Sequence, residues 1–323
     1  MTDLRIVFLD AATFGDVSLG RFTGAWNCTV HALTAPSEVL SRIDGFPVVV
    51  TNKVALDRSI INSPQAANLK LIAEAATGTD NIDLAAARER GIRVCNVPGY
   101  AAQSVAQFTI ALILELAARA GGYGQIVRDG GWEKSPIYTR FDFSTVELRE
   151  KKLGIVGYGN IGRRAAEMAR GLGMEVLISA RPGSAPAQSS GRHPLDEVLA
   201  SSDFVSLHCP LTPITKNLID SRALGLMKPT AFLINTARGA LIDEAALIHA
   251  LREKRLAGAA LDVISREPPA ADHPIIKAAK ELDNLLVTPH CAWSAREARE
   301  RLMDEVAENI LAFTQGRDRN RVA

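Results

Sequence analysis

Few features of this sequence are those of a secreted, metal-binding or nucleic-acid-binding protein. Its 323 residues include only four cysteines, Cys28, Cys95, Cys209 and Cys291, with neither a C-x-x-C pair nor zinc-ligand spacing, and we expect no signal peptide and no metal. Lys and Arg number 37 against 36 Asp and Glu, a net charge of +1. This balance gives no reason to expect nucleic acid or an anionic membrane as a partner. We expect a cytoplasmic protein with a small-molecule ligand.

A long uninterrupted hydrophobic run is also missing. The most apolar stretch, residues 105–118, contains Gln107 and Glu115 and falls short of the roughly 18 to 20 residues that a membrane span needs. We therefore predict a helix buried between two layers of one protein, starting near Ser104. A chain of 323 residues with 47% hydrophobic content is too long for one comfortable core, so two domains are expected.

The most informative stretch that is present is residues 152–162, which predicts a strand, a tight turn and a helix. Leu153, Ile155 and Val156 form a short buried run, and the turn matches G-x-G-x-x-G. The first glycine allows the turn, the second lets a pyrophosphate approach the backbone, and the third lets helix and strand pack closely. A dinucleotide would therefore contact Gly157, Tyr158, Gly159, Asn160, Ile161 and Gly162.

Strands and helices alternate on both sides of this motif. In the first hundred residues we predict strands over 4–9, 47–51, 68–75 and 92–96, a short helix from Pro36, and a helix over 84–90 capped by Asp83. Later strands are predicted over 175–179, 204–208, 231–236, 258–263 and 285–288, with an amphipathic helix over 295–314. This alternation predicts an α/β protein with two doubly wound parallel sheets.

Three segments lack a regular pattern. We predict loops over 11–24 and over 182–191, which is rich in Pro, Gly and Ser. Residues 121–144 are irregular and rich in Gly, aromatic and charged residues. We interpret that segment as an arm or an oligomer contact, and expect a homodimer.

Three polar side chains follow apolar strands, at the sheet edge where ligands of open parallel sheets bind. Arg238 follows the strand at 231–236, Glu267 follows the strand at 258–263, and His290 follows the strand at 285–288. Each of these residues alone could also have a purely structural role. Arg238 could form a surface ion pair, Glu267 could be a solvated carboxylate, and His290 could be an ordinary loop histidine. Together they match the needs of reversible hydride transfer to a 2-oxo acid.

In that reaction an arginine binds the substrate carboxylate bidentately and polarises the carbonyl. A histidine exchanges the hydroxyl proton near neutral pH, and a glutamate orients the imidazole and favours its protonated form. The sequence has no nucleophile elbow, no P-loop lysine and no H-E-x-x-H motif that would support a rival chemistry.

The chain resembles the D-isomer-specific 2-hydroxyacid dehydrogenase family, in particular its glycerate dehydrogenase and hydroxypyruvate/glyoxylate reductase branch. The resemblance spans essentially the whole chain. It rests on seven segments: ATGTDNID at 76–83, SVAQ at 104–107, GYGNIG at 157–162, VSLHCPLT at 205–212, INTARG at 234–239, ALDV at 260–263 and TPH at 288–290.

The resemblance implies Rossmann-like domains, with a dinucleotide-binding domain at 101–291 inserted into a substrate domain formed by 1–100 and 292–323. It implies Arg238 as ligand of the substrate carboxylate, His290 as acid/base and Glu267 as its partner, with backbone N–H groups of Thr77 and Gly78 near the carboxylate. The cofactor would lie near Cys209, Pro210, Thr215, Thr236 and Asp262, with Asp262 meeting the nicotinamide amide.

The strand at 175–179 ends without the acidic residue that many relatives carry. Ala180 occupies that position and Arg181 follows it. A carboxylate there would accept hydrogen bonds from the ribose 2′-OH of NAD, whereas Arg181, with the Ser179 hydroxyl, suits the 2′-phosphate of NADP. We expect NADP to be preferred and NAD to be used as well. Arg181 could instead stack on adenine or point into solvent.

The substrate itself is predicted from the resemblance more than from physics. Hydroxypyruvate and glyoxylate are the preferred candidates, with Asn52, Lys53 and Trp293 lining the pocket; each could equally be a hinge or surface residue. Two alternatives stay open. One is a non-catalytic interaction module that senses a dinucleotide, and the other is a short phosphoglycerate dehydrogenase.

Overall fold

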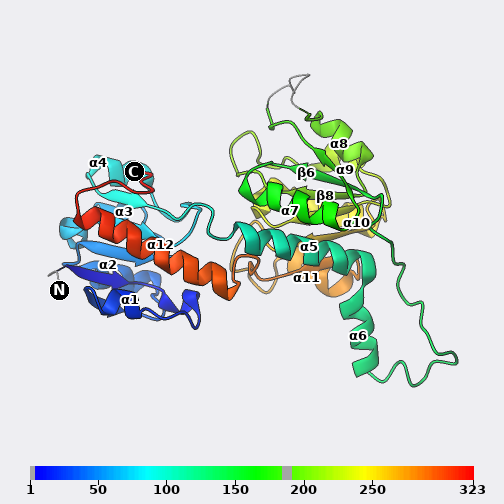
Figure 1. Ribbon diagram of the computed structural model, residues 1–323, viewed down its shortest axis with the longest axis horizontal. Coiled ribbons are helices and arrows are strands. Elements are labelled where there is room, and N and C mark those ends of the chain that lie inside the picture. Colours follow the sequence, from blue (N-terminus) through cyan, green and yellow to red (C-terminus); the bar gives the residue numbers. More distant parts are fainter. Residues whose placement is uncertain (1–3, 184–190) are drawn as a thin grey trace. The chain divides into compact units, whose positions relative to one another are not determined.

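The computed structural model describes residues 4–183 and 191–323, so the predicted loop at 182–191 lies mostly outside the described residues. The chain divides into two compact units, Met1–Ala101 with Ser294–Ala323 and Ala102–Trp293, called here the first and the second unit. Each unit is built on one sheet of parallel strands (Figure 1). The predicted fold class, two doubly wound parallel sheets, is confirmed.

The first unit has five strands in the order β2-β1-β3-β4-β5. They are β1 Arg5–Phe8, β2 Asn27–Val30, β3 Val48–Thr51, β4 Leu71–Glu74 and β5 Arg93–Cys95. Alternate side chains such as Val7 and Val49 pack on one face against α2 (Val39–Ile43), α3 (Arg58–Ile61) and α4 (Leu84–Glu89). Asp83 caps α4 by accepting a hydrogen bond from Ala86 N at 2.8 Å, as predicted.

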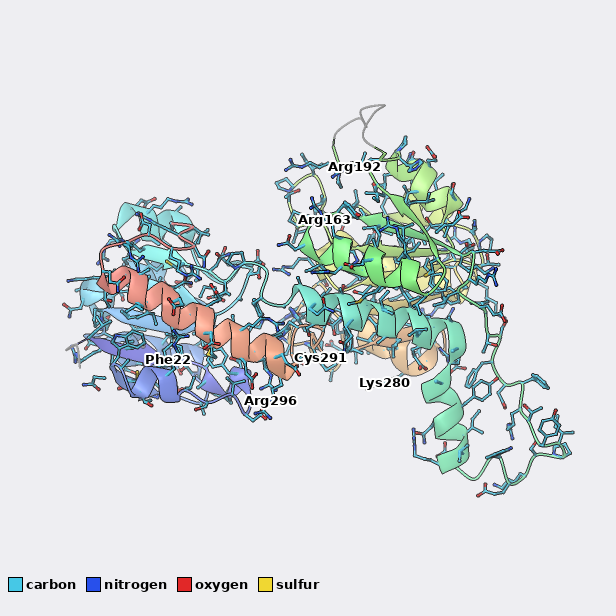
Figure 2. All side chains as sticks on the ribbon, in the orientation of Figure 1. Phe22, Arg163, Arg192, Lys280, Cys291 and Arg296 are labelled. Atoms are coloured by element: carbon cyan, nitrogen blue, oxygen red, sulfur yellow. The ribbon has the colours of Figure 1, made fainter. Side chains whose placement is uncertain are left out.

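The opposite face of this sheet carries α1 (Gly20–Thr23) and α12 (Arg296–Thr314). Phe22 of α1 packs edge-on against Phe8 with ring centroids 5.1 Å apart (Figure 2). The loop predicted over 11–24 was therefore partly wrong, because α1 and a 3-10 turn at Ala11–Phe14 lie within it. Strand β2 was not predicted, since it is a short edge strand without a buried residue and so has no apolar alternation.

The second unit has six strands in the order β11-β10-β9-β8-β6-β7. Their bounds are β6 Lys152–Val156, β7 Glu175–Ile178, β8 Phe204–Leu207, β9 Phe232–Asn235, β10 Gly258–Leu261 and β11 Leu285–Val287. One face packs against α5 (Ala102–Ala118) and α7 (Asn160–Gly171). The other face packs against α8 (Leu195–Ser201), α9 (Ser221–Leu226), α10 (Glu244–Arg252) and α11 (Pro274–Glu281).

Helix α5 is the buried apolar helix that the sequence predicted. It packs against α7, β9 and β10 (Figure 1). Among the described residues no single helix is long and apolar enough to cross a membrane; only α5 and α6 taken together pass that test, and they are bent by 63°. Helix α6 (Ala120–Arg128) corrects the expectation that residues 121–144 are irregular throughout. Its three glycines masked the helical pattern.

Glu74 is a buried acid at the end of β4. Its side chain is 0% exposed, Oε2 accepts a hydrogen bond from Asn81 Nδ2 at 3.2 Å, and Oε1 has no hydrogen-bond partner among the described residues. Burial raises the pKa of Glu74 well above its ordinary value of 4.5, against the lowering effect of the Asn81 hydrogen bond. The folded state therefore favours the neutral acid.

We predict that Glu74→Gln stabilises the protein at pH 8 and has little effect near pH 4.5. A raised folded-state pKa contributes stability that is complete below the unfolded value and is lost as the pH rises through the folded value. Thermal midpoints should differ by a few degrees at pH 8, with the variant higher. Asp44→Asn, which changes an exposed carboxylate of the same unit, is the control. A midpoint for Glu74→Gln below that of the parent at pH 8 would contradict the prediction.

Candidate active site

The glycine turn after β6 has the tight geometry and the close helix packing that the sequence predicted. Gly157 has φ 102°, and a Cβ there would lie 2.5 Å from Cys209 N, so the turn needs glycine and brings the exits of β6 and β8 together. A Cβ on Gly162 would lie 2.1 Å from Gly157 O, which forces close packing of α7 on the turn. At Gly159 no described atom lies within 4 Å of such a Cβ.

The open space over Gly159 fits an anionic ligand. Gly159 precedes the first residue of α7, and no described side chain caps that helix, so its first N–H groups point at the space. The partial positive charge of a helix N-terminus favours a pyrophosphate there. Arg163 of α7 lies beside this point, with its guanidinium 5.6 Å from the Tyr158 ring centre (Figure 2).

Four further residues of the predicted cofactor site follow β8 and β9. Cys209 is buried, and burial raises the pKa of its thiol to about 11, so the group stays neutral. The Thr215 hydroxyl donates to Pro210 O at 2.7 Å, and the Thr236 and Thr109 hydroxyls lie 3.0 Å apart. Of these predicted residues, Thr215 and Thr236 thus have their hydroxyls bonded within the protein, and Pro210 supplies the acceptor for one of them.

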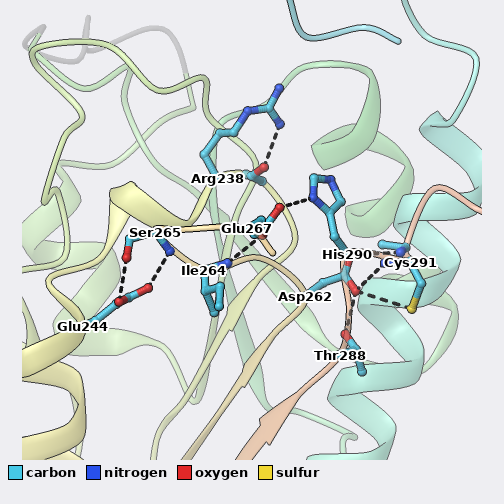
Figure 3. Close-up of polar contacts among 11 residues, drawn as sticks. Arg238, Glu244, Asp262, Ile264, Ser265, Glu267, Thr288, His290 and Cys291 are labelled. Atoms are coloured by element: carbon cyan, nitrogen blue, oxygen red, sulfur yellow. Dashed lines mark hydrogen bonds and ion pairs between the residues drawn. The ribbon is translucent and has the colours of Figure 1, made fainter. Parts of the chain in front are cut away.

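Arg238 lies on the turn after β9 and is held by a buried amide. Asn235, the last residue of β9, donates from Nδ2 to Arg238 O at 2.8 Å and accepts from Ala237 N at 3.0 Å. The Arg238 guanidinium donates to Ala237 O at 2.9 Å (Figure 3). The backbone of the turn is therefore fixed by β9, while the end of the side chain extends from the sheet edge.

His290 and Glu267 form a direct pair, although 23 residues separate them in the chain. Nδ1 of His290 lies 2.5 Å from Glu267 Oε2, and the two side chains are 32% and 31% exposed (Figure 3). The other carboxylate oxygen, Oε1, accepts from Ile264 N at 2.9 Å. With Nδ1 bonded to a carboxylate, Nε2 is the ring nitrogen left for proton exchange with a ligand.

Asp262 shapes the loop on which His290 lies. It is 1% exposed, and its carboxylate accepts from the Thr288 hydroxyl at 2.6 Å, from Cys291 N at 3.0 Å and from Ala292 N at 2.9 Å. Its backbone carbonyl accepts from His290 N at 2.8 Å. These contacts hold His290 at φ 51°, a conformation that costs a non-glycine residue free energy. The predicted contact of Asp262 with a nicotinamide amide stays a prediction.

The first unit carries the other predicted substrate residues at the carboxyl edge of its own sheet. The Asp10 carboxylate, which is 2% exposed, accepts from the backbone N–H groups of Asn52 at 3.0 Å and Lys53 at 2.6 Å. The Thr77 hydroxyl donates to Val97 O at 2.7 Å, and Gly78 follows it. Asp10 was missed by sequence reasoning because a carboxylate after a strand is common and its backbone partners are 42 residues away.

Arg181 lies just beyond β7, beside a segment that follows it in the chain. Ala180 N donates to His193 O at 2.7 Å, which brings the backbone of Arg192 next to the tip of the strand. Both arginines are exposed. The Ser179 side chain is buried and donates to Ala180 O at 2.9 Å. Arg192 was missed because only this backbone pairing places it near the strand tip.

The second unit thus brings together Arg238, Glu267 and His290 on neighbouring strand exits, with Trp293 at its end; Asn52, Lys53, Thr77 and Gly78 belong to the first unit. Among residues 4–183 and 191–323, no group of three or more His, Cys, Asp or Glu side chains could hold a metal ion. A glycine turn at the switch point of a parallel sheet is where such folds bind a dinucleotide, and Arg238, Glu267 and His290 lie at the same edge of this sheet.

Comparison with known proteins gives the family. Residues 110–292 match the NAD binding domain of the D-isomer specific 2-hydroxyacid dehydrogenases, and the chain belongs to that family. It is 39% identical over 318 residues to a glycerate dehydrogenase of Methylorubrum extorquens, with 98% of each chain covered.

Two solved structures share the whole fold. A crystal structure from Thermus thermophilus matches with a TM-score of 0.86 and 36% identity, covering 99% of this chain and 100% of the other. The NADPH-dependent glyoxylate/hydroxypyruvate reductase of Sinorhizobium meliloti, in complex with NADP and malonate, matches with a TM-score of 0.83 and 25% identity, covering 100% and 97%. The predicted family is therefore confirmed.

We predict that Gly162→Ala destabilises the protein and weakens dinucleotide binding. The added methyl group has no room against Gly157 O, so the turn and the start of α7 must separate, at about 1–3 kcal/mol for overpacking. Denaturant unfolding and titration with dinucleotide would measure both effects. Gly171→Ala, at the other end of α7 with no described atom within 4 Å of the new Cβ, is the matched control and should be neutral or stabilising. Equal stability of the two variants would contradict the prediction.

Proposed function

We propose that this protein reduces a small 2-oxo acid to the D-2-hydroxy acid with a nicotinamide dinucleotide as the hydride donor. The observation that carries the proposal is the His290–Glu267 pair, which places an imidazole with a free Nε2 at the same sheet edge as Arg238 and the glycine turn. In this arrangement Arg238 binds the substrate carboxylate, and Nε2 of His290 meets the carbonyl oxygen.

The residues divide the chemistry between them. A reduced dinucleotide held at the glycine turn of residues 157–162 would supply the hydride for the carbonyl carbon. His290 donates its Nε2 proton to the carbonyl oxygen, which becomes the hydroxyl, and the imidazole is left neutral. Glu267 keeps Nδ1 protonated and the ring oriented, as a carboxylate bonded to a histidine does, and Arg238 stabilises the negative charge that develops on the substrate.

Hydroxypyruvate and glyoxylate are the proposed substrates. The support is that similar proteins bear the names glycerate dehydrogenase and glyoxylate/hydroxypyruvate reductase. In this proposal Thr77 and Gly78 offer backbone N–H groups to the carboxylate, while Asn52, Lys53 and Trp293 limit the size of the substrate. Catalytic efficiency across a panel of 2-oxo acids tests it. A branched acid reduced far better than both would refute the substrate, and no turnover with any acid would favour a dinucleotide-sensing module.

We predict that His290→Gln lowers turnover by roughly 100-fold or more, the usual scale for a general acid. Glutamine keeps the size and polarity of the side chain but cannot donate a proton from an acidic group. Initial rates with hydroxypyruvate and glyoxylate measure the effect, and a thermal midpoint checks the fold. His249→Gln, on α10, is the control and should keep parental rates. Near-parental turnover of a folded His290→Gln enzyme would remove His290 from the reaction.

We also propose that NADPH is preferred over NADH. The tip of β7 offers the guanidinium of Arg181, with Arg192 on the adjacent segment, and Ala180 supplies no carboxylate to repel a phosphate. A guanidinium binds a phosphate through two parallel hydrogen bonds. NADH remains usable, because the absence of an acid does not exclude the smaller cofactor.

Arg181→Ala should raise the Michaelis constant for NADPH far more than that for NADH, because only NADPH carries the 2′-phosphate. A loss of about 1.5–3 kcal/mol for a charged hydrogen bond corresponds to roughly 10- to 100-fold. Michaelis constants for both cofactors, measured at one substrate concentration, give the ratio. Arg170→Ala, an exposed residue on α7, is the control. A preference of the parent enzyme for NADH would contradict the proposal that Arg181 binds the 2′-phosphate.

A homodimer in the cytoplasm is proposed as the working form. The support for the dimer is the segment from α6 to Val146, where Trp132, Ile137, Tyr138 and Phe141 are 52%, 53%, 90% and 82% exposed. Apolar side chains gathered on one surface indicate a protein interface. The arm that carries them extends from the rest of the second unit (Figure 1). All four cysteines are free thiols, as is usual in a reducing compartment.

A further inference from the structure

A second glutamate, on α10, binds the loop that carries Glu267. Glu244, the first residue of α10, accepts from Ser265 N at 2.6 Å through Oε1 and from the Ser265 hydroxyl at 2.8 Å through Oε2 (Figure 3). Its side chain is only 14% exposed. Two bonds from one buried carboxylate to one residue fix both the backbone and the side chain of that residue.

The residue before Ser265 contacts Glu267. Ile264 N donates to Glu267 Oε1 at 2.9 Å, and Glu267 Oε2 meets His290. Successive N–H groups of Ile264 and Ser265 are therefore held by two different carboxylates. A shift of Ser265 away from Glu244 moves the Ile264 N–H with it and turns the Glu267 carboxylate relative to the imidazole.

The same loop packs directly on the turn that carries Arg238. A Cβ on Gly239 would lie 1.9 Å from Ile264 C and 2.4 Å from Ser265 N, so the peptide between Ile264 and Ser265 lies on Gly239. Arg238, Gly239 and Glu244 follow each other within seven residues of chain. Glu244 therefore ties the loop of the glutamate to the element of the arginine.

His273 closes the far side of this contact. Its side chain is 8% exposed, and Nε2 lies 3.7 Å from Glu244 Oε2. Nδ1 of His273 has no hydrogen-bond partner among the described residues. The buried imidazole thus lies against the Glu244 carboxylate.

We propose that Glu244 is a positioning residue that sets the Glu267–His290 pair at a fixed place relative to Arg238. The inference rests on the proposed function of those three residues. Glu244 touches neither substrate nor cofactor in this proposal; it acts through Ser265 and Ile264. The titratable and charged groups drawn around the His290 imidazole are Glu267, Asp262, Cys291 and Arg238, on the loops that follow β9, β10 and β11 (Figure 3). Glu244 is separated from the imidazole by the Glu267 loop.

The test is a double-mutant cycle of Glu244→Ala with Glu267→Gln in the full-length enzyme. Glu244→Ala should lower kcat roughly 10- to 100-fold, the scale for misplacing a catalytic group by about 1 Å, and leave the Michaelis constant for the dinucleotide within about twofold. In the Glu267→Gln background the same change should cost almost nothing further, because the path through Glu267 is already cut. Equal losses in both backgrounds would overturn the proposal.

The pH profile adds a readout that a purely structural role would not move. A displaced Glu267 changes the contact of its carboxylate with the imidazole, so the alkaline limb of kcat/KM for reduction should move. Glu244→Ala and Glu267→Gln should shift it in the same direction. An unchanged limb in Glu244→Ala would overturn the proposal.

Milder variants guard against loss of the fold. Glu244→Gln keeps one acceptor oxygen for Ser265 and should fall between Ala and the parent, and Glu253→Gln, an exposed residue just after α10, should match the parent. If His290→Gln and Glu267→Gln keep parental turnover, the proposed function itself fails. If those two variants lose turnover while Glu244→Ala does not, only the positioning role fails.

Discussion

The buried carboxylate of Asp262 is the contact on which the candidate active site depends. It gathers the Thr288 hydroxyl and the N–H groups of Cys291 and Ala292 around one point at the exit of β10. A charged group without water is stable only when it is fully hydrogen-bonded, so the loop cannot relax without a large cost. The hydrogen bonds to Asp262 therefore keep His290 at φ 51°, where its ring contacts Glu267.

The same principle recurs at other strand exits of both sheets. Asp10 accepts backbone N–H groups from the loop after β3, Asn235 orders the turn after β9, and Glu244 accepts from the loop after β10. In each case a side chain binds the backbone of a loop, which for Asp10 and Glu244 is a loop distant in the chain. Parallel sheets bring such loops to one edge, and these polar contacts replace the solvent that the loops lose there.

The glycine turn after β6 is ordered by steric fit. Gly157 lies against the backbone of Cys209, and Gly162 lies against Gly157, so the turn is compressed between two strands and a helix. The space over Gly159 is left open at the N-terminus of α7. Tight packing around the turn and open space at one point together admit a phosphate and exclude a side chain.

Local chemistry in the sequence was enough for the parallel α/β class, the glycine turn, and the three polar residues at strand exits, because strand periodicity and glycine spacing are short-range. The tertiary structure decided what depends on contacts between distant segments. The pairing of His290 with Glu267, the role of Asp262 behind it, and the approach of Arg192 to the tip of β7 all arise where loops from different strands meet. The edge strand β2 was missed because pairing with β1 forms it and its own residues carry no apolar alternation, and α6 was missed because its three glycines are poor helix formers.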